Sequence, residues 1–187
     1  MIIETIFSTL TPSGQPNFAP MGVVWGEETL TVRPFRDTLT YRNLIATGYG
    51  VANLSDDVLS FVQSGLYDAL LPNFPASRVP GVVFQGACSW RELAVIAESG
   101  TGEQAEMLCQ VIHKGWQRDF LGFCRARSAV IEAAILATRC HLYVSTEVFA
   151  SLDHYDQIVE KTGGEAERMA IKQVREFIGR QTHGSDR

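Results

Sequence analysis

The N-terminal part of the chain alternates between apolar and polar positions, a pattern typical of half-buried strands. Residues 1–10 are rich in Ile, Thr and Phe, and a turn containing Pro and Gly leads into a second run at residues 17–25. In residues 27–35, Leu30 and Val32 fall on one face and polar side chains on the other. The pattern predicts a hairpin followed by a third strand.

Two short helical patterns interrupt the strands. Residues 38–48 offer Thr38 as an N-cap and Gly48 as the end of the helix. Residues 56–66 begin with two aspartates, which favour the first turn of a helix. Further strands are expected at residues 49–55, 82–98 and 104–115.

The pattern becomes helical in the last third of the chain. Residues 125–143 are rich in Ala, and two further helices are expected at residues 145–164 and 165–180. The element order predicts a mainly β protein with α: a small antiparallel β-barrel in residues 1–124 and a helical region in residues 125–187.

Composition and charge exclude several classes of protein. The chain has 187 residues, 45% of them hydrophobic and 20% charged, which is ordinary for a soluble domain. Its net charge of −5 speaks against nucleic acid as a partner. No run approaches the roughly 20 apolar residues of a membrane span. The four cysteines are scattered, so we expect no metal site and a cytoplasmic location.

The densest candidate chemistry lies in the stretch "RPFRDTLTYRNL", residues 33–44. Arg33 and Arg36 precede a helix start, where free backbone N–H groups attract anions. The hydroxyls of Thr38 and Thr40 add donors, and the set suits a phosphate monoester. The same residues also fit a capped helix beside solvated charges, so the pattern leaves both interpretations open.

Three residues nearer the N-terminus are candidates for contact with a flat ligand. Met21 and Gly22 follow a proline, and Gly22 would let a ligand approach the backbone, although on the spacing alone a bulge in the hairpin explains it better. Asn53, at a predicted strand end, would either bond a ligand ring or cap the next helix.

A second dense stretch, residues 113–139, interleaves basic and aromatic side chains. Lys114 and the arginines that follow it suit a flat anionic ligand better than a nucleic acid, given the acidic net charge. Motifs of hydrolases, P-loop proteins and dinucleotide-binding proteins are absent from the sequence, and no catalytic residue is indicated.

Taken together, the stretches resemble a functionally uncharacterised family of archaea and some bacteria. Its members share the fold of FMN-binding split barrels, the group that includes pyridoxamine-phosphate oxidases and flavin reductases. The resemblance covers nearly the whole chain. The segments that carry it are "IIETIFSTLTPSGQPNFAPMGV", "RPFRDTLTYRNL", "GVANLSDDVL", "HKGWQRDFLGFCRARSAVIEAAILATR" and "IVEKTGG".

The resemblance implies a six-stranded antiparallel split β-barrel with a C-terminal helical part, a homodimer, and FMN as the cofactor. Arg36, Thr38 and Thr40 then look like the phosphate-binding group. The residues expected beside the isoalloxazine ring are Met21, Gly22 and Asn53, with Arg33 and Lys114 as weaker candidates for the site. Related sequences tend to read "FNRAK" where this chain has "FCRAR", so a ligand contact by that asparagine is in doubt here.

The resemblance also sets the expected function. The first hypothesis is an FMN-dependent oxidoreductase that acts on a small anionic or cofactor-like substrate or electron donor. The second is a non-catalytic flavin-binding or scaffold protein with a partner-binding helical tail. A third is a split barrel that binds another phosphate-bearing ligand.

Overall fold

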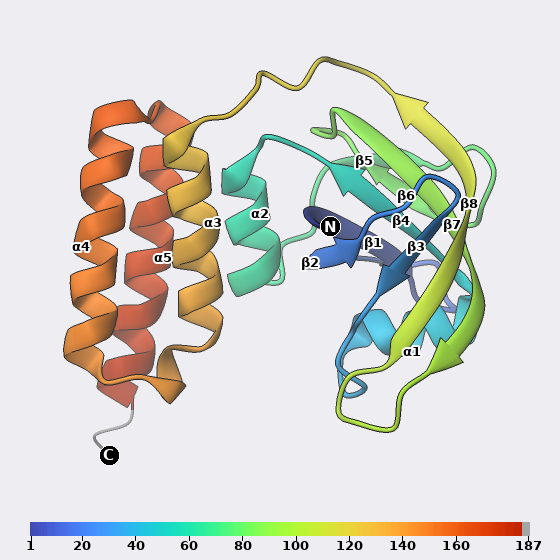
Figure 1. Cartoon of the computed structure of the whole chain (residues 1–187), viewed down its shortest axis with the longest axis horizontal. Coiled ribbons are helices and arrows are strands. Elements are labelled where there is room, and N and C mark those ends of the chain that lie inside the picture. The colour runs from blue at the N-terminus through green and yellow to red at the C-terminus, as the bar shows by residue number, and fades with distance from the viewer. Residues whose placement is uncertain (185–187) are drawn as a thin grey trace. The chain divides into compact units, whose positions relative to one another are not determined.

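The structure is a computed structural model that describes residues 1–184. The chain forms two compact units. One unit contains residues 1–56 and 68–120, and the other contains residues 57–67 and the chain from residue 121 onward. The first unit holds the strands and the second is helical (Figure 1).

The first unit is a closed barrel of six antiparallel strands, which confirms the predicted fold class. Neighbouring strands around the barrel follow the order β1-β2-β3-β8-β7-β4. The β1–β2 and β7–β8 hairpins contribute adjacent strands to the barrel, and β4 pairs with β1 to close it. The barrel strands are β1 (Ile2–Leu10), β2 (Pro16–Val24), β3 (Thr29–Val32), β4 (Tyr49–Leu54), β7 (Ser89–Ser99) and β8 (Glu106–Trp116).

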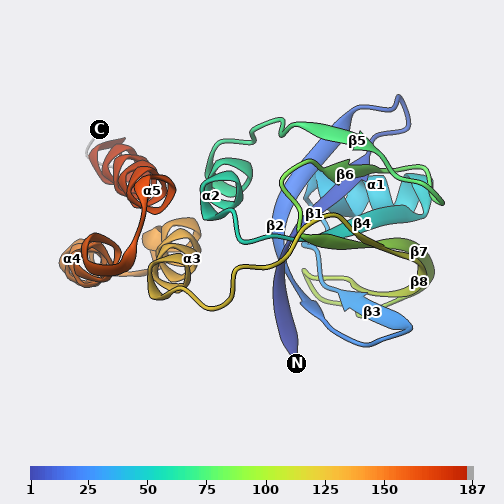
Figure 2. The same cartoon turned by 90° about the horizontal axis from the view of Figure 1, so that it is seen from above.

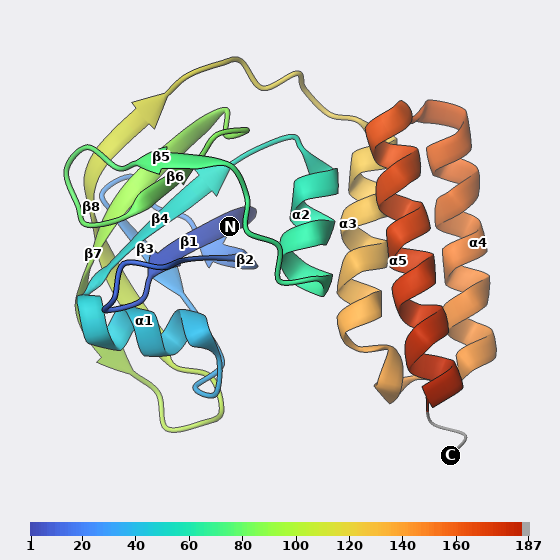
Figure 3. The ribbon, with the colours of Figure 1, turned by 180° about the vertical axis from the view of Figure 1, so that it is seen from behind.

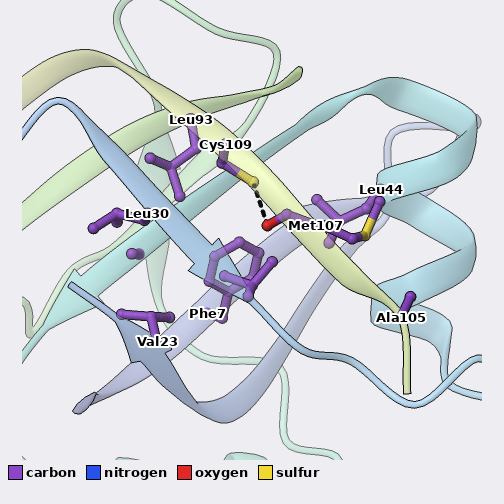
Figure 4. Packing of buried hydrophobic residues seen from close by; sticks show 10 residues of the cluster. Phe7, Val23, Leu30, Leu44, Leu93, Ala105, Met107 and Cys109 are labelled. Atoms are coloured by element: carbon purple, nitrogen blue, oxygen red, sulfur yellow. Dashed lines mark hydrogen bonds between the residues drawn. The ribbon is translucent and has the colours of Figure 1, made fainter. Parts of the chain in front are cut away.

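Alternate residues of the strands point inward and fill the barrel (Figure 4). Phe7 is completely buried at the centre of this core. Leu44 joins the same cluster from α1 (Leu39–Thr47), the helix between β3 and β4. Gly48 ends α1 with a φ of 76°, a conformation that favours glycine, as the sequence predicted.

The expected strand at residues 82–98 is in fact two strands, β6 (Val82–Phe84) and β7. A turn separates them, in which the amide of Ala87 donates to the carbonyl of Phe84. A Cβ atom on Gly86 would lie 2.5 Å from the Phe84 ring, so the close approach of turn and ring requires glycine. β6 pairs with β5 (Asn73–Pro75), a short strand that the sequence pattern did not predict.

One carboxylate anchors the loop of this small hairpin. Glu92 is completely buried on β7. Its two oxygens accept hydrogen bonds from the backbone amides of Ser77, Arg78 and Val79, at 2.9, 2.6 and 3.2 Å. The Ser77 hydroxyl and the Trp90 indole also donate to it. Burial raises the pKa of Glu92, but the hydrogen bonds from Ser77 and Arg78 outweigh burial and leave it below its ordinary value.

The second unit is a bundle of helices (Figure 2; Figure 3). α3 packs against the other three helices through a face of small side chains that includes Ala129 and Ala133. Residues 57–67 were expected in the barrel region, residues 1–124. Their contacts place them in the helical unit. The helices are α2 (Val58–Leu66), α3 (Arg125–Thr138), α4 (Ser145–Thr162) and α5 (Glu165–Gly184), with a 3-10 turn at Cys140–Leu142. Within residues 1–184, none of the helices has the length and apolar character needed to cross a bilayer.

Candidate functional site

The start of α1 presents open hydrogen-bond donors. Thr38 is the N-cap, as predicted: its hydroxyl oxygen accepts from the amide of Tyr41 at 3.3 Å. The same hydroxyl donates to the carbonyl of Phe35 at 2.7 Å. Within residues 1–184 the amides of Leu39 and Thr40 have no hydrogen-bond partner, so the first turn of α1 can donate to an anion.

Arg36 lies beside this turn and is already bound to groups of its own chain. Its guanidinium stacks on the ring of Tyr41, 5.2 Å from the centroid, and donates to the Tyr41 hydroxyl at 2.7 Å. It also forms an ion pair with Glu98 at 2.6 Å. The hydrogen bond to Glu98 is the main reason that the pKa of Arg36 is raised, and the bond from Arg36 lowers the pKa of Glu98.

The other two candidates from the opening stretch lie nearby. Arg33 forms a half-exposed ion pair with Glu106 at 2.9 Å. Thr40 is buried, and its hydroxyl oxygen accepts from the side-chain amide of Asn17 at 3.1 Å. The structure therefore brings Arg33, Arg36, Thr38 and Thr40 to one end of the barrel, with Thr40 itself buried there.

Arg42, which the sequence analysis did not single out, adds a positive charge to the same turn. Its Nε donates weakly to the carbonyl of Thr38 at 3.4 Å. Its side chain pairs with no carboxylate within residues 1–184. The sequence signal was its position four residues after the N-cap Thr38, since residues four apart share one face of a helix.

The three candidates for ring contact lie on adjacent strands but on different faces. Met21 on β2 packs against the barrel core, so its side chain points inward. Gly22 points outward, because a Cβ atom there would lie 2.9 Å from the side chain of Ile2. The side chains of Ile2 and Glu4 lie over this point, so a ligand could approach the backbone of Gly22 only if these flexible side chains turned aside.

Asn53 on β4 is completely buried and serves the barrel itself. Its side-chain nitrogen donates to the carbonyl of Ile6 at 2.8 Å, and its oxygen accepts from the amide of Phe84 at 2.9 Å. The interpretation of Asn53 as the cap of the next helix is wrong, because Asp57 caps α2 through the amide of Ser60. Asn53 links β1, β4 and β6.

Lys114 lies at the opposite end of the barrel from Arg36. It sits eight residues along β8 from Glu106, the partner of Arg33, a span of roughly 26 Å at the rise of a strand. Its ammonium group pairs with Glu27 and Glu28 at 3.1 and 3.3 Å. Lys114 and the α1 turn therefore do not contact one ligand the size of a phosphate.

The basic and aromatic stretch of residues 113–139 is divided between the two units. In the barrel unit Arg118 pairs with Asp56 at 2.6 Å. In the helical unit Arg127 pairs with Glu167 at 3.0 Å. Both guanidiniums thus have carboxylate partners within their own unit.

The α1 end of the barrel fits a phosphate better than any other predicted position. Two open amides, the positive end of the helix and the Arg42 guanidinium meet there. Arg36 can contribute its charge, but a bidentate contact would require it to give up existing bonds. The group fits the phosphate end of FMN.

Comparison with protein families assigns both parts of the chain. Residues 3–118 match the model of the N-terminal domain of a protein family of unknown function, DUF447. Residues 124–176 match the second model of the same family. No curated protein matches the chain.

Solved structures give the same relationship. An FMN-bound DUF447 protein from Methanosarcina mazei superimposes with a TM-score of 0.82 and 26% identity, covering 94% of each chain. A flavoredoxin from Methanosarcina acetivorans gives a TM-score of 0.56 at 14% identity, over 65% of this chain and 72% of the flavoredoxin. The flavin reductase of a styrene monooxygenase from Pseudomonas putida gives 0.54 at 13% identity, over 62% and 81%. The last two share the barrel fold, and the family models show that the chain belongs to the DUF447 family.

Proposed function

We propose that the chain binds FMN, with the phosphate at the start of α1. The observation that carries the proposal is the coincidence of an FMN-bound relative at 26% identity with open anion donors at this turn. The amides of Leu39 and Thr40 would donate to the phosphate, and Arg36 and Arg42 would balance its charge. Thr38 keeps the turn in place as its cap.

The isoalloxazine ring would lie along the outer face of β2 near Gly22. The flexible side chains of Ile2 and Glu4 lie over this position and would have to turn aside for the ring to reach the glycine backbone. Met21, also on β2, packs against the barrel core on the inner side of the strand and would hold in place the surface that the ring contacts. Asn53 would act indirectly, by holding β1, β4 and β6 together.

We further propose that the protein is an oxidoreductase acting on a small anionic or cofactor-like substrate. FMN, when bound, supplies the electron or hydride transfer, and the protein binds and orients it. Such a mechanism needs no nucleophile or metal from the chain. Residues 1–184 hold no group of three or more His, Cys, Asp or Glu side chains placed for a metal ion.

A homodimer is part of the proposal, as the resemblance to FMN-binding split barrels implies. The outer edge of the barrel near Gly22 exposes an apolar side chain, since Ile2 is 62% exposed there, next to the carboxylate of Glu4. A second subunit covering this surface would bury the apolar residues and shield a bound ring from water. Size-exclusion chromatography with light scattering would detect the expected dimer, and a monomer at micromolar concentration would contradict it.

Two titrations test the function. Quenching of flavin fluorescence by the flavin-free protein should give a tighter dissociation constant for FMN than for riboflavin, which lacks the phosphate. Equal affinities would contradict the phosphate site.

Anaerobic addition of NADH or NADPH to the FMN-loaded protein should then bleach the flavin absorbance. Tight FMN binding without reduction by any donor would favour the alternative, a non-catalytic flavin-binding protein whose exposed Leu142 and Tyr143 on the helical unit contact a partner.

A further inference from the structure

The guanidinium of Arg36 has almost no donor left for a ligand. An arginine carries five N–H groups. Nε donates to the carbonyl of Gly102 at 3.2 Å, and Nη2 donates to the carbonyl of Gly100 at 2.7 Å. Nη1 donates to the Tyr41 hydroxyl at 2.7 Å and to Glu98 at 2.6 Å. One N–H of Nη2 is left, which is too few for the bidentate grip typical of arginine and phosphate.

Among these acceptors, Glu98 differs from the others in charge and freedom. The carbonyls of Gly100 and Gly102 belong to the turn that joins β7 to β8, and Tyr41 is fixed in α1. Glu98 is the charged acceptor, and its side chain is 32% exposed. Because it is a side chain at the surface, it can turn into water while the backbone acceptors stay where they are.

A carboxylate and a phosphate compete for the same edge of a guanidinium. Both are anions, and both accept charge-assisted hydrogen bonds from it. With Glu98 in place, a phosphate at the start of α1 meets a neutralised Arg36 and a neighbouring negative charge. With Glu98 turned away, the N–H of Nη1 that it accepts becomes available to the ligand, while the other still donates to Tyr41. The Tyr41 hydroxyl, which also donates to Glu98 at 3.0 Å, is released as well.

We propose that Glu98 is an internal competitor for the ligand phosphate and sets the affinity of the FMN site. This inference rests on the proposed FMN function. Glu98 holds Arg36 in position while the site has no phosphate, and the dianion must displace it to bind. The competition selects for a ligand with a doubly charged phosphate, because a weaker anion does not replace the carboxylate. Because riboflavin carries no phosphate, the competition lowers the affinity for FMN and leaves the affinity for riboflavin nearly unchanged.

The substitution Glu98→Gln tests the inference. The amide oxygen still accepts from Arg36, but the competing charge is gone. We expect the dissociation constant for FMN to fall about tenfold, the size of effect that a hydrogen bond to a charged group has. Riboflavin affinity should change less than about twofold, since riboflavin carries no phosphate.

The matched control is Glu106→Gln. Glu106 belongs to the same end of the β7–β8 hairpin, opposite Ser99, and pairs with Arg33 instead of Arg36. Removing its charge changes the net charge at this end of the hairpin as Glu98→Gln does, and it leaves the Arg36 contacts intact. Circular dichroism and urea unfolding would verify that each variant folds, and Glu98→Ala is the second variant if the glutamine form does not.

The outcomes separate the inference from the function on which it rests. If the wild type and all variants fail to bind FMN, the proposed function is wrong. If the wild type binds FMN and Glu98→Gln binds it equally or more weakly, the site stands and the competition does not exist. An equal gain in Glu106→Gln, or an equal gain for riboflavin, would also overturn the inference.

Discussion

The buried carboxylate of Glu92 gives the most quantitative prediction for stability. Its oxygens accept from the amides of Ser77, Arg78 and Val79, the Ser77 hydroxyl and the Trp90 indole. The substitution Glu92→Gln keeps the size of the side chain but turns one acceptor into a donor. Either orientation of the new amide leaves at least two N–H groups, partly buried or buried, facing another N–H.

Each buried donor left without an acceptor costs about 1–3 kcal/mol. With two such donors, we expect Glu92→Gln to lower the free energy of unfolding by about 2–5 kcal/mol at neutral pH. The matched control is Glu103→Gln, because Glu103 is exposed and its carboxylate has no partner within residues 1–184. Substitutions of that kind stay within about 0.5 kcal/mol of the wild type.

Urea unfolding followed by tryptophan fluorescence measures both variants, and a pH series adds a second check. The pKa of Glu92 is lowered in the folded chain. Its stabilisation is therefore complete above the unfolded value of about 4.3 and is lost as pH falls through the folded pKa. The difference between wild type and Glu92→Gln should shrink in acid. A difference below about 0.5 kcal/mol at pH 7, or one that does not change with pH, would refute the reasoning.

Three further predictions concern the predicted site residues. Arg36→Ala should weaken FMN binding at least tenfold and riboflavin binding much less in fluorescence titrations; unchanged FMN affinity would exclude the phosphate assignment. Thr38→Ala should cost about 1 kcal/mol of unfolding free energy through the lost cap, and equal urea midpoints would show that the cap is unimportant. Asn53→Ala should destabilise the barrel by about 2–3 kcal/mol; weakened FMN binding at unchanged stability would instead make Asn53 a ligand contact.

The sequence predicted the ends of an element correctly where they depend on residues close together in the chain. The cap at Thr38 and the end at Gly48 both depend on residues within the same turn, and both are confirmed. The strand predicted at residues 82–98 failed because the break at Gly86 depends on how closely the Phe84 ring folds over the backbone. Residues 57–67 carry no signal of the distant helices against which they pack.

The candidate site shows the same limit more sharply. The prediction that Arg36 and Thr38 lie in one site is correct, because they are two residues apart in the chain. Apart from Tyr41, the acceptors of Arg36 lie more than 60 residues further on, so spacing could not reveal that its donors are occupied. In the sequence, Glu92 looks like an ordinary polar residue on a strand. Its burial depends on contacts with the distant loop at residues 77–79, which the local pattern does not show.

The measurement that tests the central claim most directly is an absorbance spectrum of the purified protein after incubation with FMN and desalting. We predict that the protein retains the absorbance bands of the flavin at close to one FMN per chain, while an Arg36→Ala sample treated identically retains much less. A protein that emerges without flavin absorbance would contradict the assignment of the α1 end of the barrel as an FMN site.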